Sequence, residues 1–415
     1  RSRGWTSAVA DTVNFYRCMF YFLVYPGLGS RRGAFESCPF FPDRRQARVQ
    51  CYSLALIFYL WSKPHYRNAS YQEDMVKNLR NVAVPGTGLP LSVVSHFRIV
   101  ALLFVLFVNP ILCLAAALNG LRRFKRPWAD AYCEQLLCPQ DWFSFWRLNC
   151  RLASYHALET GSPGYAQEDK WTFLVDGMKK GVPVSPVLDT PALVVKDKNE
   201  EGGLGIFFYK NALHGGDWIL QERLYNDAFV SSLLPSNAPL STMRVITASR
   251  WWLERQAGRA DADIGADCVA ALSSVFRAGR AGASTDHSSI LFDVDAATGA
   301  IRRGTTNAHW YRLGPAAMAG CPWTSTHDAE VHPDCDTRLT GAVIPDMAGI
   351  LKTVREAHRT MLPDVPLVGW DVAMTTRGIC LLEVNLSCNF FRGSFDVDAY
   401  IELIDDYFVA LERLR

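Results

Sequence analysis

The stretch PLVGWDVAMTTRGICLLEVN, which runs from Pro366 to Asn385, predicts a β-hairpin. Val368 and the run Trp370 to Met374 have the apolar and β-branched character of one strand. Thr375 to Gly378 supply a turn, and Ile379 to Val384 form the second run. The two runs are therefore expected to pair as antiparallel neighbours.

Three oxygen-bearing side chains of this hairpin converge in the predicted pairing. Asp371 lies on the first strand, and Glu383 and Asn385 stand two residues apart on the second, so their side chains leave the same face. Magnesium prefers such carboxylate oxygens, together with phosphate oxygens and water. We predict a metal site of Asp371, Glu383 and Asn385. The alternative is a solvated hairpin edge with ordinary polar residues.

Length and charge narrow the classes of function. The 415 residues suffice for two or three domains. With 43 basic and 41 acidic residues, the overall charge gives no reason to expect a nucleic-acid partner. A Ser-His-Asp signature, a nucleophile elbow and a P-loop motif are missing from the sequence, which argues against a hydrolase or a P-loop kinase.

The first part of the chain, residues 1–137, predicts an apolar helical region. Thr12 to Tyr25 and Tyr52 to Trp61 are short or interrupted, which favours buried or interfacial helices. Ile99 to Leu118 has no charged residue and is long enough to cross a hydrocarbon layer, and a basic cluster follows at Arg122 to Arg126. Pro110 is expected to kink this helix.

Two interpretations of Ile99 to Leu118 stay open from the sequence. One is a membrane-embedded or membrane-surface helix, which would give the protein a membrane contact. The other is a wholly buried helix of a helical cap. We expect a cytoplasmic catalytic domain, and membrane association is the open alternative.

From Lys170 the pattern changes to alternating strands and helices. Ala192 to Lys196 and Ile206 to Tyr209 predict two strands, joined by a loop with Gly202, Gly203 and Gly205. Glycine permits unusual dihedral angles and lets backbone amides approach a phosphate closely. The alternative is a hairpin with a flexible tip and a surface lysine.

The following segments predict more strands and two closing helices. Arg244 lies inside an apolar strand, where its guanidinium needs an anion unless the strand is at an edge. Gln221 and Glu222 face opposite sides of their strand. The predicted strands are Trp218 to Leu224, Thr242 to Thr247, Val275 to Gly279 and Ser289 to Val294, and the helices are Asp346 to Met361 and a C-terminal segment around Tyr400 to Leu411.

Taken in order, these motifs resemble the ATP-grasp superfamily, and most closely its sugar-transfer-associated group, which is related to alpha-L-glutamate ligases. The resemblance covers residues 138–415 and implies an α+β fold of two subdomains that clasp a nucleotide, preceded by the helical region 1–137. It is carried by Lys170 before GVPVSP at 181–186, VVK at 194–196, EGGLG at 201–205, LQERL at 220–224, TMRVIT at 242–247, VFRAG at 275–279, HP at 332–333 and GWD…LLEVN at 369–385.

The resemblance implies roles for individual residues. Lys170 and Lys196 match the lysines that contact nucleotide phosphates, and Gln221 and Glu222 match contacts to the base or ribose. The metal ligands match Asp371, Glu383 and Asn385, and the phosphate-stabilising arginines match Arg244 and Arg277. His332 is a candidate for acceptor binding or proton handling, although a lone histidine before proline is more often structural.

The resemblance also implies an activity. We expect an ATP- and Mg²⁺-dependent ligase that activates a small carboxylate as an acyl phosphate, which an amine then attacks. In such a site the protein mainly places charge around the phosphates. A kinase of the same fold and a non-catalytic nucleotide-binding scaffold at a membrane are the two alternatives.

Overall fold

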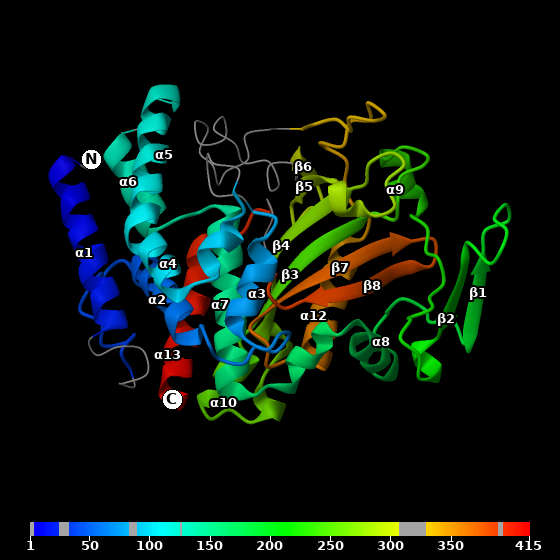
Figure 1. Cartoon of the computed structure of the whole chain (residues 1–415), viewed down its shortest axis with the longest axis horizontal. Coiled ribbons are helices and arrows are strands. Elements are labelled where there is room, and N and C mark those ends of the chain that lie inside the picture. Colours follow the sequence, from blue (N-terminus) through cyan, green and yellow to red (C-terminus); the bar gives the residue numbers. More distant parts are fainter. Residues whose placement is uncertain (1–3, 25–32, 83–88, 125–126, 307–328, 389–392) are drawn as a thin grey trace.

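The computed structural model describes residues 4–24, 33–82, 89–124, 127–306, 329–388 and 393–415. The protein is mixed α+β, as expected. Figure 1 shows a helical end that contains both termini, a sheet beside it, and a two-stranded hairpin that projects from the opposite end.

The helices follow the predicted apolar segments, and several begin with a side-chain cap. Asp169 caps the helix that starts at Lys170, and Asp346 caps the one that starts at Met347. The α-helices are α1 (Trp5–Leu23), α2 (Arg45–Leu60), α3 (Tyr71–Leu79), α4 (Arg98–Leu103), α5 (Asn109–Phe124), α6 (Trp128–Leu137), α7 (Trp142–Thr160), α8 (Lys170–Lys179), α9 (Ala228–Leu233), α10 (Trp251–Gln256), α12 (Met347–Met361) and α13 (Val397–Leu414).

The strands form two antiparallel sheets. A small sheet pairs β1 with β2, and a six-stranded sheet has the order β6-β5-β4-β3-β7-β8. The strands are β1 (Ala192–Lys196), β2 (Ile206–Lys210), β3 (Thr242–Ser249), β4 (Val269–Ala278), β5 (Ile290–Val294), β6 (Ile301–Thr306), β7 (Leu367–Thr375) and β8 (Gly378–Asn385).

The predicted hairpin is confirmed as β7 and β8. The two strands meet at Thr375 and Gly378, and the register sets Asp371 opposite Glu383. A β-bulge lies between Asp371 and Val372. The hairpin forms one side of the large sheet, so its inner strand β7 also pairs with β3.

One face of the large sheet is covered by α12. Trp370 of β7, Val245 of β3 and Phe276 of β4 belong to the same buried cluster as Ile350 and Val354 of α12. Because side chains alternate along a strand, the residues between these apolar positions point to the other face. That other face carries the predicted functional side chains.

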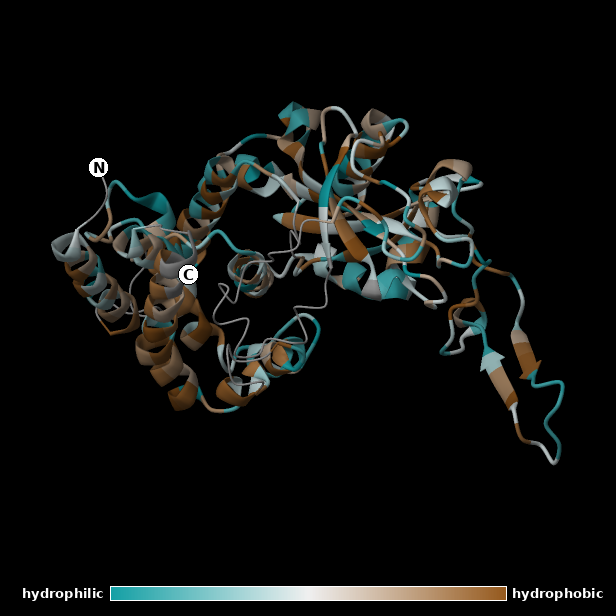
Figure 2. Cartoon of the chain, turned by 90° about the horizontal axis from the view of Figure 1, so that it is seen from above, coloured by the Kyte–Doolittle hydropathy of each residue, from teal (hydrophilic) through white to brown (hydrophobic). Residues whose placement is uncertain are grey.

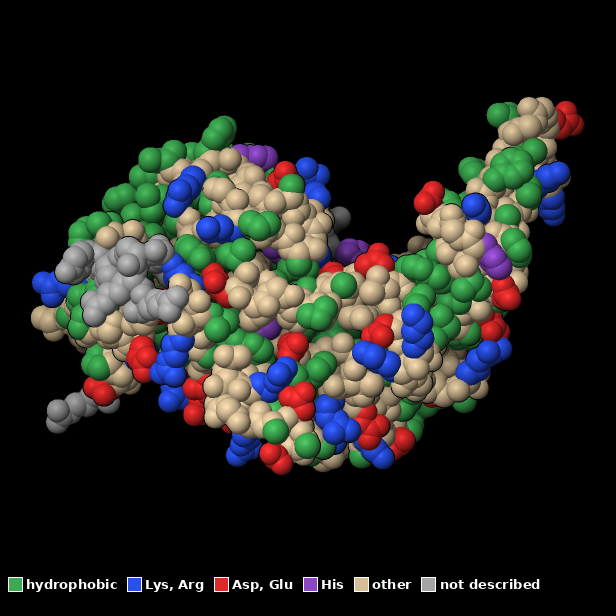
Figure 3. Space-filling model, turned by 90° about the horizontal axis from the view of Figure 1, so that it is seen from below, with side chains coloured by type: hydrophobic (Ala, Val, Ile, Leu, Met, Phe, Trp, Pro, Cys, Tyr) green, Lys and Arg blue, Asp and Glu red, His purple; other side chains and the backbone are tan. Residues whose placement is uncertain are grey.

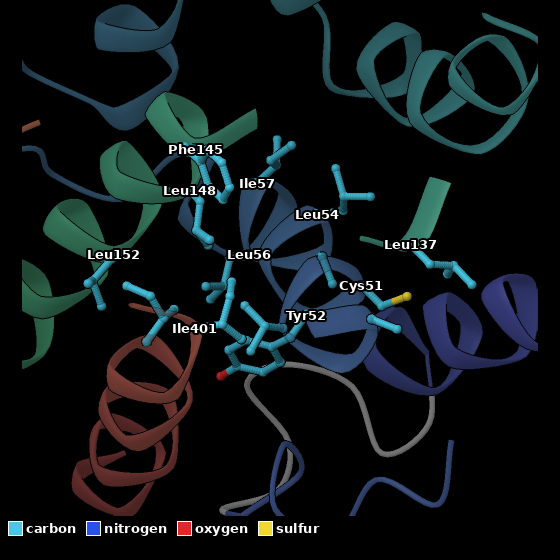
Figure 4. Close-up of a cluster of buried hydrophobic side chains, with 14 of the residues drawn as sticks. Cys51, Tyr52, Leu54, Leu56, Ile57, Leu137, Phe145, Leu148, Leu152 and Ile401 are labelled. Atoms are coloured by element: carbon cyan, nitrogen blue, oxygen red, sulfur yellow. The ribbon is translucent and has the colours of Figure 1, made fainter. Parts of the chain in front are cut away.

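The helical end has its own hydrophobic core. Figure 4 shows Tyr52, Leu56 and Ile57 of α2 packed toward Phe145, Leu148 and Leu152 of α7 and Ile401 of α13. The C-terminal helix therefore packs with helices from the start of the chain. The buried Glu412 of α13 reinforces this contact, since it accepts hydrogen bonds from the Phe35 amide and the Tyr52 hydroxyl at 2.6 and 2.7 Å.

The apolar run Ile99 to Leu118 is helical, and the alternative of a wholly buried helix is wrong. It spans α4, a π-helical turn η2 (Phe104–Val108) and the first part of α5, and only 28% of its most apolar window is buried. Asn109 donates its backbone N–H to the carbonyl of Phe104 in this turn. The wider turn lies directly before Pro110, where a kink was expected.

The predicted strand Trp218 to Leu224 is also corrected. The segment is extended but forms only isolated bridges, between Gln221 and Val187 and between Trp218 and Asn211. Its hydrogen bonds to residues 186–188 join it to a neighbouring extended segment instead of a full sheet strand.

Buried histidines make the stability of the protein dependent on pH. Burial lowers the pKa of His156 to about 3 and that of His358 to about 4. An unfolded histidine titrates near 6.5, so the stabilisation is complete above about pH 6.5 and is lost as the pH falls toward the folded value. When the pH falls from about 7.5 to about 5, each of these two histidines is expected to lower the free energy of unfolding by about 2 kcal/mol.

A substitution isolates the effect of one histidine. Urea unfolding of the wild type and of His156→Gln at the two pH values measures the fall in unfolding free energy. The fall is expected to be smaller in the variant by about 2 kcal/mol. An equal fall in both proteins would show that His156 does not titrate in this way.

Candidate functional site

Four strands place the predicted charged residues on the face of the large sheet opposite α12. Asp371 of β7 stands between two cross-strand partners, Arg244 on β3 and Glu383 on β8. On β4, Val275 is the partner of Arg244, and Arg277 lies two residues further on the same face. A row of two arginines followed by two carboxylates therefore crosses four strands.

Asp371 binds both arginines. Its Oδ1 accepts a hydrogen bond from Nε of Arg244 at 2.5 Å, and its Oδ2 accepts one from Nη1 of Arg277 at 3.1 Å. Asp371 and Arg244 are buried, with 5% and 7% of their surface exposed. A buried carboxylate keeps its charge only when cations compensate it, and here two do so.

The pKa of Asp371 reflects this balance. Burial alone raises the pKa of the carboxyl, but the positive charges of Arg244 and Arg277 outweigh it and hold the pKa below its usual value. The Asp371 carboxylate is therefore ionised at neutral pH although it is buried.

The network continues to a loop residue. Arg277 donates from Nη2 to Asp286 at 2.9 Å, and the other oxygen of Asp286 accepts from the backbone N–H and hydroxyl of Thr242 at 3.1 and 2.5 Å. Burial raises the pKa of Asp286, and the charge of Arg277 opposes this shift. Arg277 thus links two carboxylates on neighbouring elements.

A second ion pair lies at the β8 side of the site. Nζ of Lys170, the first residue of α8, is 3.0 Å from Oε2 of Glu383. The Lys170 side chain is 70% exposed and that of Glu383 is 32% exposed, so both reach solvent. Asn385, two residues on, has a buried side-chain nitrogen without a hydrogen-bond partner in the described part of the chain.

Gly369 provides the space that this arrangement needs. A Cβ atom at this position would lie 2.6 Å from Cβ of Cys388 and 3.3 Å from the Arg244 side chain. The absence of a side chain in the Gly-Trp-Asp motif lets Arg244 reach across β7 to Asp371.

The second predicted phosphate lysine lies elsewhere. Lys196 is at the end of β1, and all five residues of that strand are exposed. Gly202, Gly203 and Gly205 form the tip of the same hairpin and all have positive φ angles, between 64° and 83°. Figures 1 and 3 show this hairpin projecting away from the body of the molecule. The structure brings Lys170, but not Lys196, to Glu383.

Gln221 and Glu222 lie nearer to the hairpin of the large sheet. Glu222 accepts a hydrogen bond from Arg377 in the turn between β7 and β8 at 2.6 Å. Gln221 bridges to Val187, and its side-chain nitrogen reaches the carbonyl of Ser185 at 3.5 Å.

His332 is held in a structural role. Its Nε2 is 3.0 Å from the carbonyl oxygen of Gly279, and its Nδ1 accepts from the backbone N–H of Asp334 at 3.1 Å. The side chain is fully buried. Both ring nitrogens are therefore engaged by the backbone, and we assign His332 no part in the chemistry below.

The donor set agrees with magnesium in chemical type. Among the residues that the structure describes, no group of three or more His, Cys, Asp or Glu side chains is arranged to hold a metal ion. The predicted set is of another kind, because it combines two carboxylates with an amide. Its ligands would be oxygen atoms, which a hard cation prefers, and they come from two adjacent strands. In this structure each carboxylate is paired with a cation of the protein itself.

Asp286 is a residue of the site that is not among the predicted site residues. It lies nine residues after Arg277, in a loop that closes with a short 3-10 turn. No periodicity links a loop carboxylate to an arginine on a preceding strand, so Asp286 was not among the predicted site residues.

Comparisons of the chain with protein-family models, with curated proteins and with solved structures found no match.

Proposed function

We propose that this chain is an ATP-grasp enzyme, an ATP- and Mg²⁺-dependent ligase that joins a carboxylate to an amine. The observation that carries the proposal is the cluster of three carboxylates and three cations on one face of the sheet. Asp371, Asp286 and Glu383 form ion pairs there with Arg244, Arg277 and Lys170.

Balanced charge of this kind suits a ligand that carries both signs. A nucleotide triphosphate brings several negative charges, and its accompanying magnesium ion brings two positive ones. The phosphate oxygens would form ion pairs with Lys170 and Arg277 in place of their present carboxylate partners. The carboxylates freed in this way would face the metal ion. Lys170 is the most exposed member and can change partner at the lowest cost.

The exposed β1–β2 hairpin is suited to close over a bound nucleotide. The hairpin exposes Val194 of β1, Phe208 of β2 and Leu204 of the loop between them, and a two-stranded hairpin is only marginally stable by itself. Figure 3 shows a hollow between this hairpin and the body of the molecule. Closure of the hairpin over a bound nucleotide would bury these apolar side chains and bring Lys196 and the glycine-rich tip toward the phosphates.

In this proposal the protein contributes position and charge. Asp371, Glu383 and Asn385 would hold magnesium, which supplies charge neutralisation at the phosphates when bound. Lys170 and Arg277 would orient the γ-phosphate, and Arg244 would keep Asp371 ionised and in place.

The proposed reaction has two transfers. A carboxylate oxygen of the substrate attacks the γ-phosphorus, the bond to the bridging oxygen breaks, and ADP leaves. The amine nitrogen then attacks the acyl carbon, the carbon–oxygen bond to phosphate breaks, and the amine loses a proton. The products are an amide, ADP and phosphate, so the balance needs no further reactant.

A non-catalytic scaffold remains as a second candidate because of one observation. Both oxygens of Asp371 are already bound to arginines of the protein. If these ion pairs persist when nucleotide is present, Asp371 cannot hold a metal ion, and the cluster is a structural element of the sheet.

Release of ADP from ATP by the purified chain separates the reaction classes. Pools of small carboxylates and small amines are added separately and together. The ligase is expected to release ADP only with both pools, and mass spectrometry is expected to find an amide. ADP release with one pool and a stable phosphorylated product would select the kinase. No release with any pool would contradict an enzymatic function.

A further inference from the structure

The first helix carries two apolar faces. One face of α1 is buried in the helical core and includes Phe15, Cys18 and Phe22. The other face is exposed, and its large apolar side chains recur every three or four residues, which is the spacing of one helical stripe. They are Trp5, Val9, Val13, Tyr16, Phe20 and, directly after the helix, Val24.

The continuous helix of α4, η2 and α5 also has one buried and one exposed apolar face. Ala101, Val105 and Cys113 are buried, whereas a second set of apolar side chains is exposed at intervals of three or four residues. This exposed stripe includes Ile99, Leu103, Phe107, Ile111, Leu114, Leu118 and Leu121. A helix on the surface of a soluble domain normally turns such a stripe inward.

The two stripes lie on the same side of the molecule. A cavity of about 710 Å³ is lined from one side by Phe20 and Val24 of the first stripe and from the other by Ile99 of the second. Tyr16 also donates from its hydroxyl to the carbonyl oxygen of Leu106 at 2.7 Å, which ties α1 to η2. Figures 2 and 3 show the hydrophobic residues gathered at this helical end.

We propose that this face, formed by α1 and the helix from Arg98 to Leu118, docks into a lipid bilayer. An apolar surface of this extent on a monomer marks an interaction site. The helix has 21 residues, which at about 1.5 Å per residue gives about 30 Å, close to the thickness of the hydrocarbon layer.

The ends of the helix favour lipid over a protein partner. Arg98 stands at the beginning of the apolar stretch, and after its last residue, Leu118, the sequence continues to Arg122-Arg123-Phe124-Lys125-Arg126. Basic residues at both ends of an apolar stretch suit anionic lipid headgroups. Trp5, whose ring lies 4.3 Å from that of Trp128, stands at the α1 end where aromatic side chains commonly meet the interface.

Vesicle flotation with the full chain tests this proposal. The probe is a vesicle of phosphatidylcholine and phosphatidylserine. The wild type is expected to float with the vesicles, and Phe107→Glu/Ile111→Glu is expected to lower the partition coefficient at least about tenfold. Phe20→Glu, on the other helix, is expected to lower it as well. All three positions are exposed, so the fold is expected to survive, and circular dichroism checks this.

The matched control is Phe208→Glu, which changes a still more exposed phenylalanine on the projecting hairpin. It is expected to float like the wild type. A wild type that stays with the soluble fraction would overturn the proposal, as would Glu variants that float normally. A dimer in lipid-free buffer that both Glu variants dissociate would also overturn it, because a second copy would then cover this face.

Discussion

Replacement of Asp371 with asparagine is expected to lower the free energy of unfolding by about 3–5 kcal/mol. The substitution keeps the size of the side chain but removes the charge that compensates Arg244. The arginine is buried, so it would be left as a cation in an apolar environment without its main partner. Urea unfolding followed by tryptophan fluorescence measures this loss.

A second substitution tests the cause of the loss. Arg244→Met in the Asp371→Asn background removes the uncompensated cation, so the double variant is expected to recover part of the lost stability. A double variant that is less stable than Asp371→Asn alone would show that the buried charge is not the cause.

The ion pair at the other side of the site is expected to affect ligand binding and not stability. Lys170→Met and Glu383→Gln are each expected to weaken ATP binding in the presence of Mg²⁺ by about 10- to 100-fold, the value of one lost charged contact. Each is expected to change the unfolding free energy by less than about 1 kcal/mol, because the pair reaches solvent.

Lys352→Met is the matched control for Lys170→Met. Lys352 is also 70% exposed and also pairs with a glutamate, Glu356, but it lies on α12, which covers the opposite face of the sheet. It is expected to bind ATP like the wild type. Equal weakening in both lysine variants would indicate a general effect of lost surface charge.

The sequence predicted the hairpin because a local pattern of two strands and a turn determines it. Its register was not predictable in the same way. The turn sets Val372 opposite Leu381, and only the β-bulge between Asp371 and Val372 brings Glu383 opposite Asp371. The strands around Arg244 and Arg277 were predicted from local patterns as well.

The partners of these residues could not be predicted from local patterns. Arg244 and Asp371 are 127 residues apart, and only the order of the strands makes them neighbours. The sequence indicated that Arg244 needs an anion, and the structure supplies Asp371 in that role. Only the assembled sheet shows that Asp371, the proposed metal ligand, is also the anion that compensates Arg244.

The position of the β1–β2 hairpin could also not be predicted from the sequence. Periodicity predicts that Lys196 ends a strand, but it contains no information on where a two-stranded sheet without a helix of its own is placed. In the same way, the hydropathy of Ile99 to Leu118 left two interpretations open, and its exposure in the fold removed one of them.

Titration of the wild type with ATP by calorimetry, with and without Mg²⁺, tests the proposed nucleotide site. We expect saturable binding to one site that requires Mg²⁺ and is weakened in Glu383→Gln while the fold is retained. Lack of saturable binding, or binding that Glu383→Gln leaves unchanged, would contradict a nucleotide site at this face of the sheet.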